Sequence, residues 1–450
     1  MIQMNFGKQF KKILTLFIII PLSSGYAFDP FEDSGLPADR ATKYIEGLGF
    51  KVGEKNILKD GTILLWEVGT ATIKQKPEDP NFINSRRIAY DEALLKAKSN
   101  LVNRLGVELS GSIVSDCKEG NFPSPEIIEN PNLETAKSIL GKGKLLLLSK
   151  IDNALEENGL QPTLIKESQL AEEEKIAKLQ EAADYAKRLL SRSEYQRDVK
   201  TIANRLVSGV QTVMVFEDFT PGETNGTISV AAAISEKTLQ LAASLSQNNP
   251  DLAPIGDPFN TGLSIKQTIQ EIGKGLLTKQ GVQMYKDENG NPLLLSFAHS
   301  QAITNSTDAK LRAVEKAETN ATQYIVQFMG EMVSASKAIF ESQTLDELTN
   351  SEEHIDYQEA FESKKGVTFD TGGLPIKGIT KVIDWAQPHP LTNQEIIGVV
   401  QAWSPSSSLI LQEIDDAKNS SSNDNSNSST TVIIEDEYSS ESKSSSNIDF

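Results

Sequence analysis

An internal duplication is the feature of this sequence that most constrains its fold. Residues 209–235 align without a gap with residues 378–404 and contain two apolar, Val-rich segments. Gly209 falls on Gly378 and Ile228 on Ile397, so both segments keep a separation of 169 residues. Turn-forming residues lie between the segments in each copy. A constant separation across a turn is hard to obtain by chance, and we therefore expect two copies of one structural unit.

A strand followed by a helix is repeated upstream of each strand pair. The strand Ile63–Ile73 matches residues 292–303, with Gly69 aligned to His299, and the helix at 86–106 matches 309–330. Residues four apart lie on one helical face, where small side chains allow close packing on a sheet. Four residues at this spacing in the first helix align with residues 220 positions later in the second: Ala93 with Ala313, Ala97 with Ala317, Leu101 with Ala321 and Leu105 with Ile325. Each copy predicts the order β-α, spacer, β-β-α, and an α+β fold.

The duplication divides the chain into module 1 at residues 28–250 and module 2 at 251–417. Module 1 has about 51 additional residues, which we assign to a helical insertion at about 130–205. Its clearest segment has apolar residues at helical spacing, as in an amphipathic helix: Ile176, Leu179, Ala183, Ala186 and Leu190. Two interpretations stay open: a solvated helical hairpin, and a partner-binding coiled coil in which residues 165–205 contact a helical partner.

Both ends of the sequence differ in composition from the modules. Residues 1–27 have the pattern of a secretory signal peptide, with lysines before an apolar run at 13–22 and small residues before a cleavage site at Ala27. Residues 418–450 are rich in Ser, Asn and acidic residues and cannot form a core, so we expect a disordered tail. Its apolar island at 431–434 is a candidate for pairing with a partner's sheet edge. The predicted location is periplasmic, secreted or at the cell surface.

Charge and cysteine content exclude several classes of function. The formal net charge of −18, without a basic cluster beyond the signal peptide, argues against binding to nucleic acid. Outside the signal peptide, no stretch has the apolar length of a transmembrane segment. Cys117 is the one cysteine, which excludes a disulfide within the chain, and we expect it to be buried.

Candidate chemical motifs are weak throughout the sequence. His299, His354 and His389 have no metal-ligand spacing, and we expect structural or surface roles for them. Residues 287–291 begin like a calcium loop but lack its Gly and Glu, so we expect a hairpin loop. Residues 141–144 (GKGK) lack the remainder of a phosphate-binding loop and predict a turn between helices. No catalytic, cofactor-binding or metal-binding residue is predicted, and no metal or nucleotide is expected to be required for folding.

A family resemblance rests on the strand–helix–hairpin pattern. The matching residues are Val68–Ala71, Ala93, Ala97 and the strand Ile228–Ile234, with their counterparts in the second copy. They resemble the N-terminal domain of the flagellar assembly protein T and related small bacterial surface lipoproteins. The resemblance implies an α+β envelope module, commonly non-enzymatic. This sequence departs from the pattern in lacking a lipid-attachment cysteine, in having two copies and in its helical insertion.

Two functions follow as alternatives. The first is a non-enzymatic scaffold or adaptor that contacts other envelope proteins, because paired modules present two similar surfaces. The second is a periplasmic hydrolase whose carboxylates meet only in the folded chain. A cleft lined by carboxyl groups with raised pKa values would favour the hydrolase.

Overall fold

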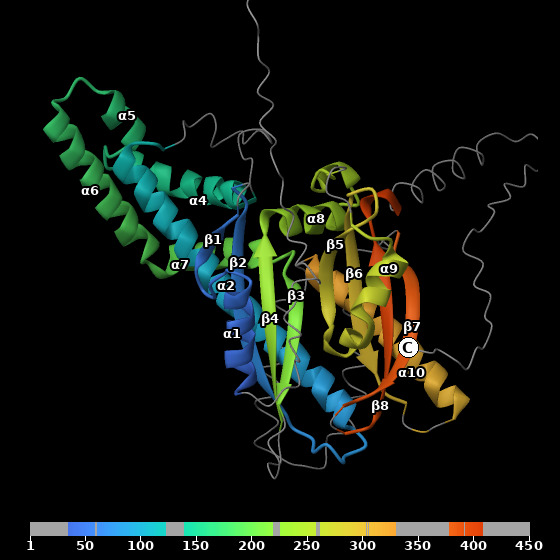
Figure 1. Cartoon of the computed structure of the whole chain (residues 1–450). Helices are drawn as coiled ribbons and strands as arrows, with labels where there is room; N and C mark the ends of the chain where they lie inside the picture. The colour runs from blue at the N-terminus through green and yellow to red at the C-terminus, as the bar shows by residue number, and fades with distance from the viewer. Residues whose placement is uncertain are drawn as a thin grey trace, which may run out of the picture.

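The chain folds into two four-stranded antiparallel sheets with helices packed on them, an α+β architecture (Figure 1). The structure is a computed structural model and describes residues 35–407, except 59–60, 123–138, 219–225, 258–261, 303, 305, 330–377 and 391. The predicted signal peptide, the acidic tail with its island at 431–434, and His354 lie outside the described residues. No helix in the described part is long and apolar enough to cross a membrane.

The two sheets have the same strand order, which confirms the duplication. The first sheet has the order β1-β2-β4-β3 and the second β5-β6-β8-β7. A register shift interrupts β3 between Thr212 and Met214, and β7 between Lys381 and Ile383, which are the aligned positions. The strands are β1 (Lys55–Ile57), β2 (Ile63–Ile73), β3 (Gln211–Asp218), β4 (Gly226–Ser235), β5 (Gly281–Lys286), β6 (Pro292–Ser300), β7 (Thr380–Pro388) and β8 (Glu395–Trp403).

The sequence alignment of the first repeated strand is wrong by one residue. Val230 of β4 pairs with Gly69, whereas the equivalent Val399 of β8 pairs with Ala298. Ala298 is therefore the counterpart of Gly69, and His299 is the counterpart of Thr70. Side chains alternate between the two faces of a strand, so a slip of one residue exchanges them. His299 accordingly lies on the sheet face opposite to the one that the repeat analysis implied.

Helices α2 (Phe82–Glu119) and α10 (Thr307–Phe328) carry the alanine-rich faces predicted from the repeats. Ala97 and Ala317 are 0% exposed, and each helix packs on the sheet of its own module. Gly69 makes the approach of α2 to its sheet so close that an added Cβ would lie 1.9 Å from the carbonyl oxygen of Ala93. The predicted orientation of both helices is confirmed.

The opposite sheet faces are covered by helices that the repeat pattern did not predict. Helix α1 (Pro37–Gly47) packs Ala41 and Ile45 against Trp66 of the first sheet. Helix α9 (Ile265–Ile272) and the 3-10 helix η2 (Gly273–Thr278) cover the second sheet in the same way. Helix α8 (Glu236–Ser246) and the 3-10 helix η1 (Pro250–Leu252) follow β4. Each module is thus a sheet between two helical layers.

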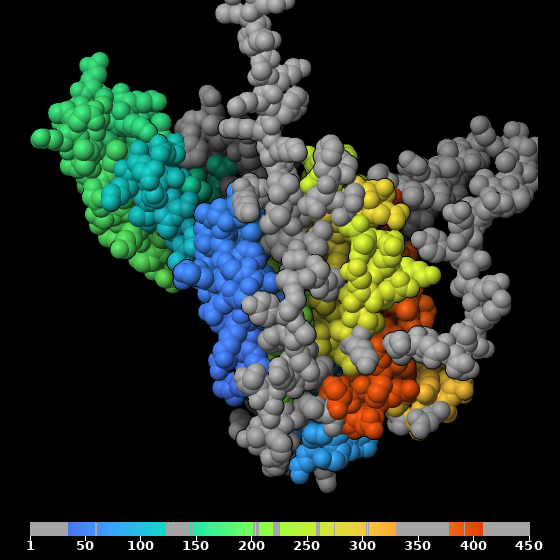
Figure 2. All heavy atoms as spheres, viewed as in Figure 1, coloured from blue at the N-terminus to red at the C-terminus, as the bar shows by residue number. Residues whose placement is uncertain are grey.

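The helical insertion forms an arm that projects from module 1 (Figures 1 and 2). It comprises α4 (Ile139–Glu156), α5 (Pro162–Glu167), α6 (Glu172–Leu190), α7 (Ser193–Leu206) and the distal part of α2. The arm has its own hydrophobic core, which includes the buried Cys117. Two expectations are wrong: residues 141–144 lie within α4 instead of forming a turn, and Ile176 is 66% exposed.

Helix α2 belongs to two cores at once because its buried face rotates along its length. Its buried stripe recurs every fourth residue, from Ala93 to Cys117. Four residues exceed one turn of 3.6, so each step advances roughly 40° around the helix axis. Leu101 and Leu105 therefore face the core of module 1, whereas Ile113 and Cys117 face the core of the arm.

Candidate functional site

The two modules join at the edges of their sheets, where β3 of module 1 lies beside the start of β5 of module 2 (Figure 1). The two sheets remain separate, and side chains connect the edges. The side-chain oxygen of Gln211 accepts a hydrogen bond of 2.9 Å from the backbone N–H of Met284. The ammonium of Lys279 donates to the carbonyl oxygen of Val213 at 3.0 Å. Hydrogen bonds between polar side chains and the backbone thus connect the two modules, and this junction is the candidate site.

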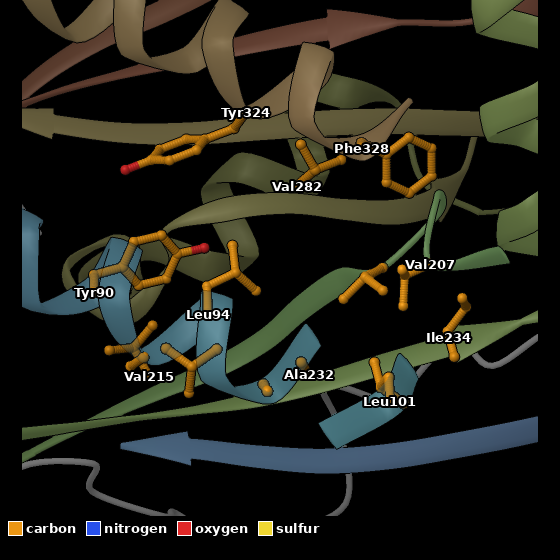
Figure 3. Close-up of a cluster of buried hydrophobic side chains, with 14 of the residues drawn as sticks. Tyr90, Leu94, Leu101, Val207, Val215, Ala232, Ile234, Val282, Tyr324 and Phe328 are labelled. Atoms are coloured by element: carbon orange, nitrogen blue, oxygen red, sulfur yellow. The ribbon is translucent and has the colours of Figure 1, made fainter. Parts of the chain in front are cut away.

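A hydrophobic cluster with polar tips fills the centre of the junction (Figure 3). It combines side chains from α2, β3 and β4 with side chains from β5 and α10, including Leu94, Val282 and Phe328. The rings of Tyr90 and Tyr324 meet edge to face, with centroids 5.5 Å apart.

Both tyrosine hydroxyls in this cluster are hydrogen-bonded across the junction. The hydroxyl of Tyr90 lies 2.6 Å from that of Thr212 and donates to the carbonyl oxygen of Gln280 at 3.0 Å. The hydroxyl of Tyr324 donates to Asp91 at 3.1 Å. Burial raises the pKa of Tyr90 and of Tyr324, so both rings remain neutral phenols.

A buried group of charged and ionisable side chains lies at one end of the junction. We refer to Arg40, Arg86, Glu217, His299 and His389 as the junction cluster; each of them is at most 3% exposed. Module 1 supplies the first three residues and module 2 the two histidines. Charged side chains are rarely buried to this degree unless they are paired, so their partners decide what the cluster can do.

Arg86 is the centre of the junction cluster. Its guanidinium holds the carboxylate of Glu217 through two nitrogens, with Nε 2.6 Å from Oε1. Its Nη1 lies 2.9 Å from Nδ1 of His299, and its Nη2 donates to the carbonyl oxygen of Leu277 at 2.9 Å. One side chain of α2 therefore binds an acid of its own module and two groups of the other module.

Glu217 is held ionised by its neighbours. Burial by itself raises the pKa of this carboxyl, but Arg86 and the hydrogen bond from His389 outweigh it and lower the pKa to about 2. Nε2 of His389 lies 3.4 Å from Oε2 of Glu217. Arg40 of α1 also donates to the backbone carbonyl oxygen of Glu217. Glu217 thus receives hydrogen bonds from side chains of both modules.

His299 is held neutral in the same cluster. Burial and the nearby Arg86 lower its pKa to about 3. Its Nε2 lies 3.2 Å from the carbonyl oxygen of Leu276, which can only accept a hydrogen bond. The proton is therefore assigned to Nε2, and Nδ1 accepts from Arg86. The Trp385 ring packs edge to face on the imidazole, with centroids 5.2 Å apart.

Further contacts extend the junction beyond the cluster. Lys98 of α2 donates to the carbonyl oxygen of Gln327 at 3.2 Å, and burial lowers its pKa to about 8. The side-chain amide of Gln394 donates to the carbonyl oxygens of Pro77 and Asp79, at 3.0 and 2.8 Å. Lys98 is therefore a buried contact residue of the junction.

The junction cluster joins the two modules, and its five side chains are at most 3% exposed. An acid–base pair for catalysis has to reach a substrate, whereas Glu217 and His389 are 2% and 0% exposed. In the part of the chain that the structure describes, no three His, Cys, Asp or Glu side chains form a group that could hold a metal ion. The chemistry of the cluster is charge compensation inside the protein.

The structure places the residues that the sequence singled out in two different settings. His299 and His389 meet in the junction cluster, far from each other in sequence. Asp287 closes the β5–β6 hairpin by accepting from the backbone N–H groups of Asn289 and Asn291, as expected for a loop. Sequence reasoning missed Arg86 and Glu217.

A signal for Arg86 was present in the sequence. Arg86 lies four residues before Tyr90, on the stripe that continues to Ala93 and Ala97. A charged residue on an otherwise apolar helical face indicates a buried ionic partner. The partner itself, 131 residues away, has no local signal.

Comparison with known proteins gives little guidance. No protein-family model matches the chain, and no curated protein matches it. A solved structure of a hypothetical protein from Francisella tularensis is similar at 18% sequence identity, covering 76% of this chain and 83% of that protein, with a TM-score of 0.39. The function of this chain has to be inferred from its own residues.

Proposed function

We propose that this chain is an exported, non-enzymatic envelope protein that acts as a structural or adaptor scaffold through protein–protein contacts. The observation that carries the proposal is helix α2, which is continuous over 38 residues and contributes to the cores of both module 1 and the arm. At 1.5 Å per residue it spans roughly 57 Å. The arm is thereby joined to module 1 by one continuous helix, so a partner that displaces the arm would also displace the helix in the core of module 1.

The character of the ionisable groups supports a non-enzymatic role. Burial raises the pKa of Glu67 and of Asp152, the property expected of catalytic carboxyls. Glu67 lies on β2 with Arg104 as its charged neighbour, whereas Asp152 lies on α4 near Glu156. The two groups do not form a pair of the kind that hydrolases use. No specific observation favours the hydrolase.

The arm is the surface that we assign to a partner. Ile176 of α6 and Leu164 of α5 are 66% and 61% exposed, on helices that contact each other. Contiguous exposed apolar surface marks protein-binding sites, and we propose that these two side chains belong to such a surface. We include in this proposal the export signal at residues 1–27 and the relationship to the envelope modules named above.

Site-specific photo-crosslinking in cells tests the proposal. A photoreactive phenylalanine analogue replaces Ile176 or Leu164 on the arm, and Leu311 of α10, which is 57% exposed, serves as the matched control. We expect both arm positions to crosslink the same envelope protein and Leu311 not to do so.

Two results would contradict the scaffold. One is a lack of crosslinks from both arm positions, or the same crosslinks from Leu311. The other is hydrolysis of ester, peptide or glycoside substrates by the purified chain that is lost in Glu67→Gln or Asp152→Asn.

A further inference from the structure

We propose that His299 makes the junction between the modules acid-sensitive: neutral, it joins Arg86 to module 2, and on taking up a proton it leaves the cluster and opens that end of the junction. The inference goes beyond the scaffold function and does not depend on it. It rests on the hydrogen-bond geometry of one imidazole between two modules.

The geometry leaves no place for a second proton on this imidazole. Nε2 donates to the carbonyl oxygen of Leu276, and Nδ1 accepts from Nη1 of Arg86 at 2.9 Å. Arg86 is always a donor and always charged. A proton on Nδ1 would place two N–H groups and two positive charges against each other, in a site where His299 is 1% exposed.

The charged groups around His299 act in opposite directions. Arg86 from α2 and His389 from the β7–β8 turn disfavour its protonation, and Glu217 from β3 favours it. A new proton on Nδ1 would point at Nη1 of Arg86 and not at Glu217, whose Oε1 and Oε2 already lie against Arg86 and His389. Trp385 from β7 closes another side with an aromatic edge. The net effect is strong resistance to protonation, in agreement with the lowered pKa of His299.

This resistance links the junction to pH. A histidine released from the cluster has an ordinary pKa near 6.5, so below that pH the open form binds a proton that the closed form rejects. Stability of the closed junction is therefore complete above about pH 6.5 and decreases as the pH falls toward the folded-state pKa of about 3. For one such histidine the opening equilibrium constant rises roughly 25-fold between pH 7 and pH 5.

Hydrogen–deuterium exchange of the full chain between pH 7 and pH 5 tests the proposal, after correction for the pH dependence of intrinsic exchange. Peptides from the cluster end of the junction, residues 276–280 and 389–395, are compared with the centre of β4, residues 228–234. We expect the protection of the junction peptides to fall roughly 25-fold toward pH 5, while β4 keeps its protection.

His299→Asn is the informative variant, because the Asn oxygen can accept from Arg86 and does not titrate. We expect its junction peptides to keep their protection at pH 5. His389→Asn tests the other histidine of the cluster separately. Lys96→Met, at a side chain of α2 that is 46% exposed, is the matched control and should keep the acid response of the unmodified chain. An unchanged response in His299→Asn, or one abolished only in His389→Asn, would overturn the proposal.

NMR titration of the histidine ring signals in the unmodified chain provides a test that needs no variant. We expect one ring signal to remain neutral until the junction opens. The proposal is wrong if all three rings titrate near pH 6.5 while the junction stays protected, or if the junction peptides show no loss of protection down to pH 5. Loss of protection in β4 at the same pH would also overturn it, because the response would then be global unfolding.

Discussion

Replacing Arg86 with Met removes a side chain that binds Glu217 of module 1 together with His299 and η2 of module 2. The carboxylate of Glu217 would then stay buried without its principal counter-charge. The lowering of its pKa from 4.5 to about 2 corresponds to roughly 3 kcal/mol, at about 1.4 kcal/mol per pH unit. Breaking a buried ion pair on one side typically costs about 3–5 kcal/mol. We expect Arg86→Met to lower the free energy of unfolding by about 3–5 kcal/mol at pH 7.

The pH dependence of the variant is the sharper signature. In the unmodified chain, Glu217 contributes stability above about pH 4.5 that is lost as the pH falls toward 2. Without Arg86, burial dominates and raises the pKa of the carboxyl. The folded variant then binds a proton more readily than the unfolded chain. The difference in free energy of unfolding between Arg86→Met and the unmodified chain should therefore shrink as the pH is lowered from 7 to 5.

Denaturant unfolding followed by tryptophan fluorescence measures the effect, since Trp385 lies against His299 in the cluster. Lys96→Met is the matched control on the same helix: Lys96 is 46% exposed, and its ion pair with Glu92 at 2.7 Å should contribute at most about 1 kcal/mol. The double variant Arg86→Met with Glu217→Gln should recover part of the loss. A loss below about 1 kcal/mol in Arg86→Met would refute the buried charge pair.

Three further predictions concern packing, the junction and export. Ala97→Leu and Ala317→Leu should each destabilise the protein by about 1–3 kcal/mol in thermal or denaturant melts, whereas Glu318→Ala should stay within about 0.5 kcal/mol; two silent Leu variants would show that the alanine stripes are not packed. Lys98→Ala should cost about 1–3 kcal/mol in the same melts, because it removes the hydrogen bond from a charged, buried side chain to the carbonyl oxygen of Gln327 near the end of α10. A neutral effect would argue against that contact. Mass spectrometry of the exported chain should find an N-terminus at Phe28, and a chain that retains Met1 would contradict cleavage after Ala27.

The sequence predicted the parts of the fold that are repeated and periodic. Aligned strands and alanine-faced helices were readable, because the duplication gives two independent views of each of them. The β5–β6 hairpin was readable from its loop residues 287–291. The arm was predicted as helical, although its buried side was partly misjudged at Ile176. Helices α1 and α9 were not predicted, since they differ in sequence and lie outside the aligned segments.

The junction could not be predicted from the sequence. Glu217 and His389 meet only because two sheet edges are brought together, and no local spacing records that contact. The slip of one residue at Gly69 has a similar origin: apolar residues occupy both faces of β2 and β6, so the alternation that normally fixes a register is missing.

The way the two copies meet has a consequence for how they diverge. The edge strand β3 of one copy touches β5, which occupies the place of β1 in the other copy, so the contact is head-to-tail. A two-fold contact would require one self-complementary patch, whereas a head-to-tail contact uses two different surfaces. A substitution in the contact surface of one copy therefore need not be matched by the same substitution at the equivalent position of the other copy.

The other edge strand of the second sheet, β7, illustrates this asymmetry. β7 occupies the place of β3, yet it exposes Lys381 and Asp384, and Ala386 stands where β3 has Glu217. Charges on an edge strand discourage the addition of a further strand. Head-to-tail contacts could in principle add further copies of the module one after another. In the second copy, however, the β5 edge contacts module 1, whereas the β7 edge carries charged side chains that favour contact with water.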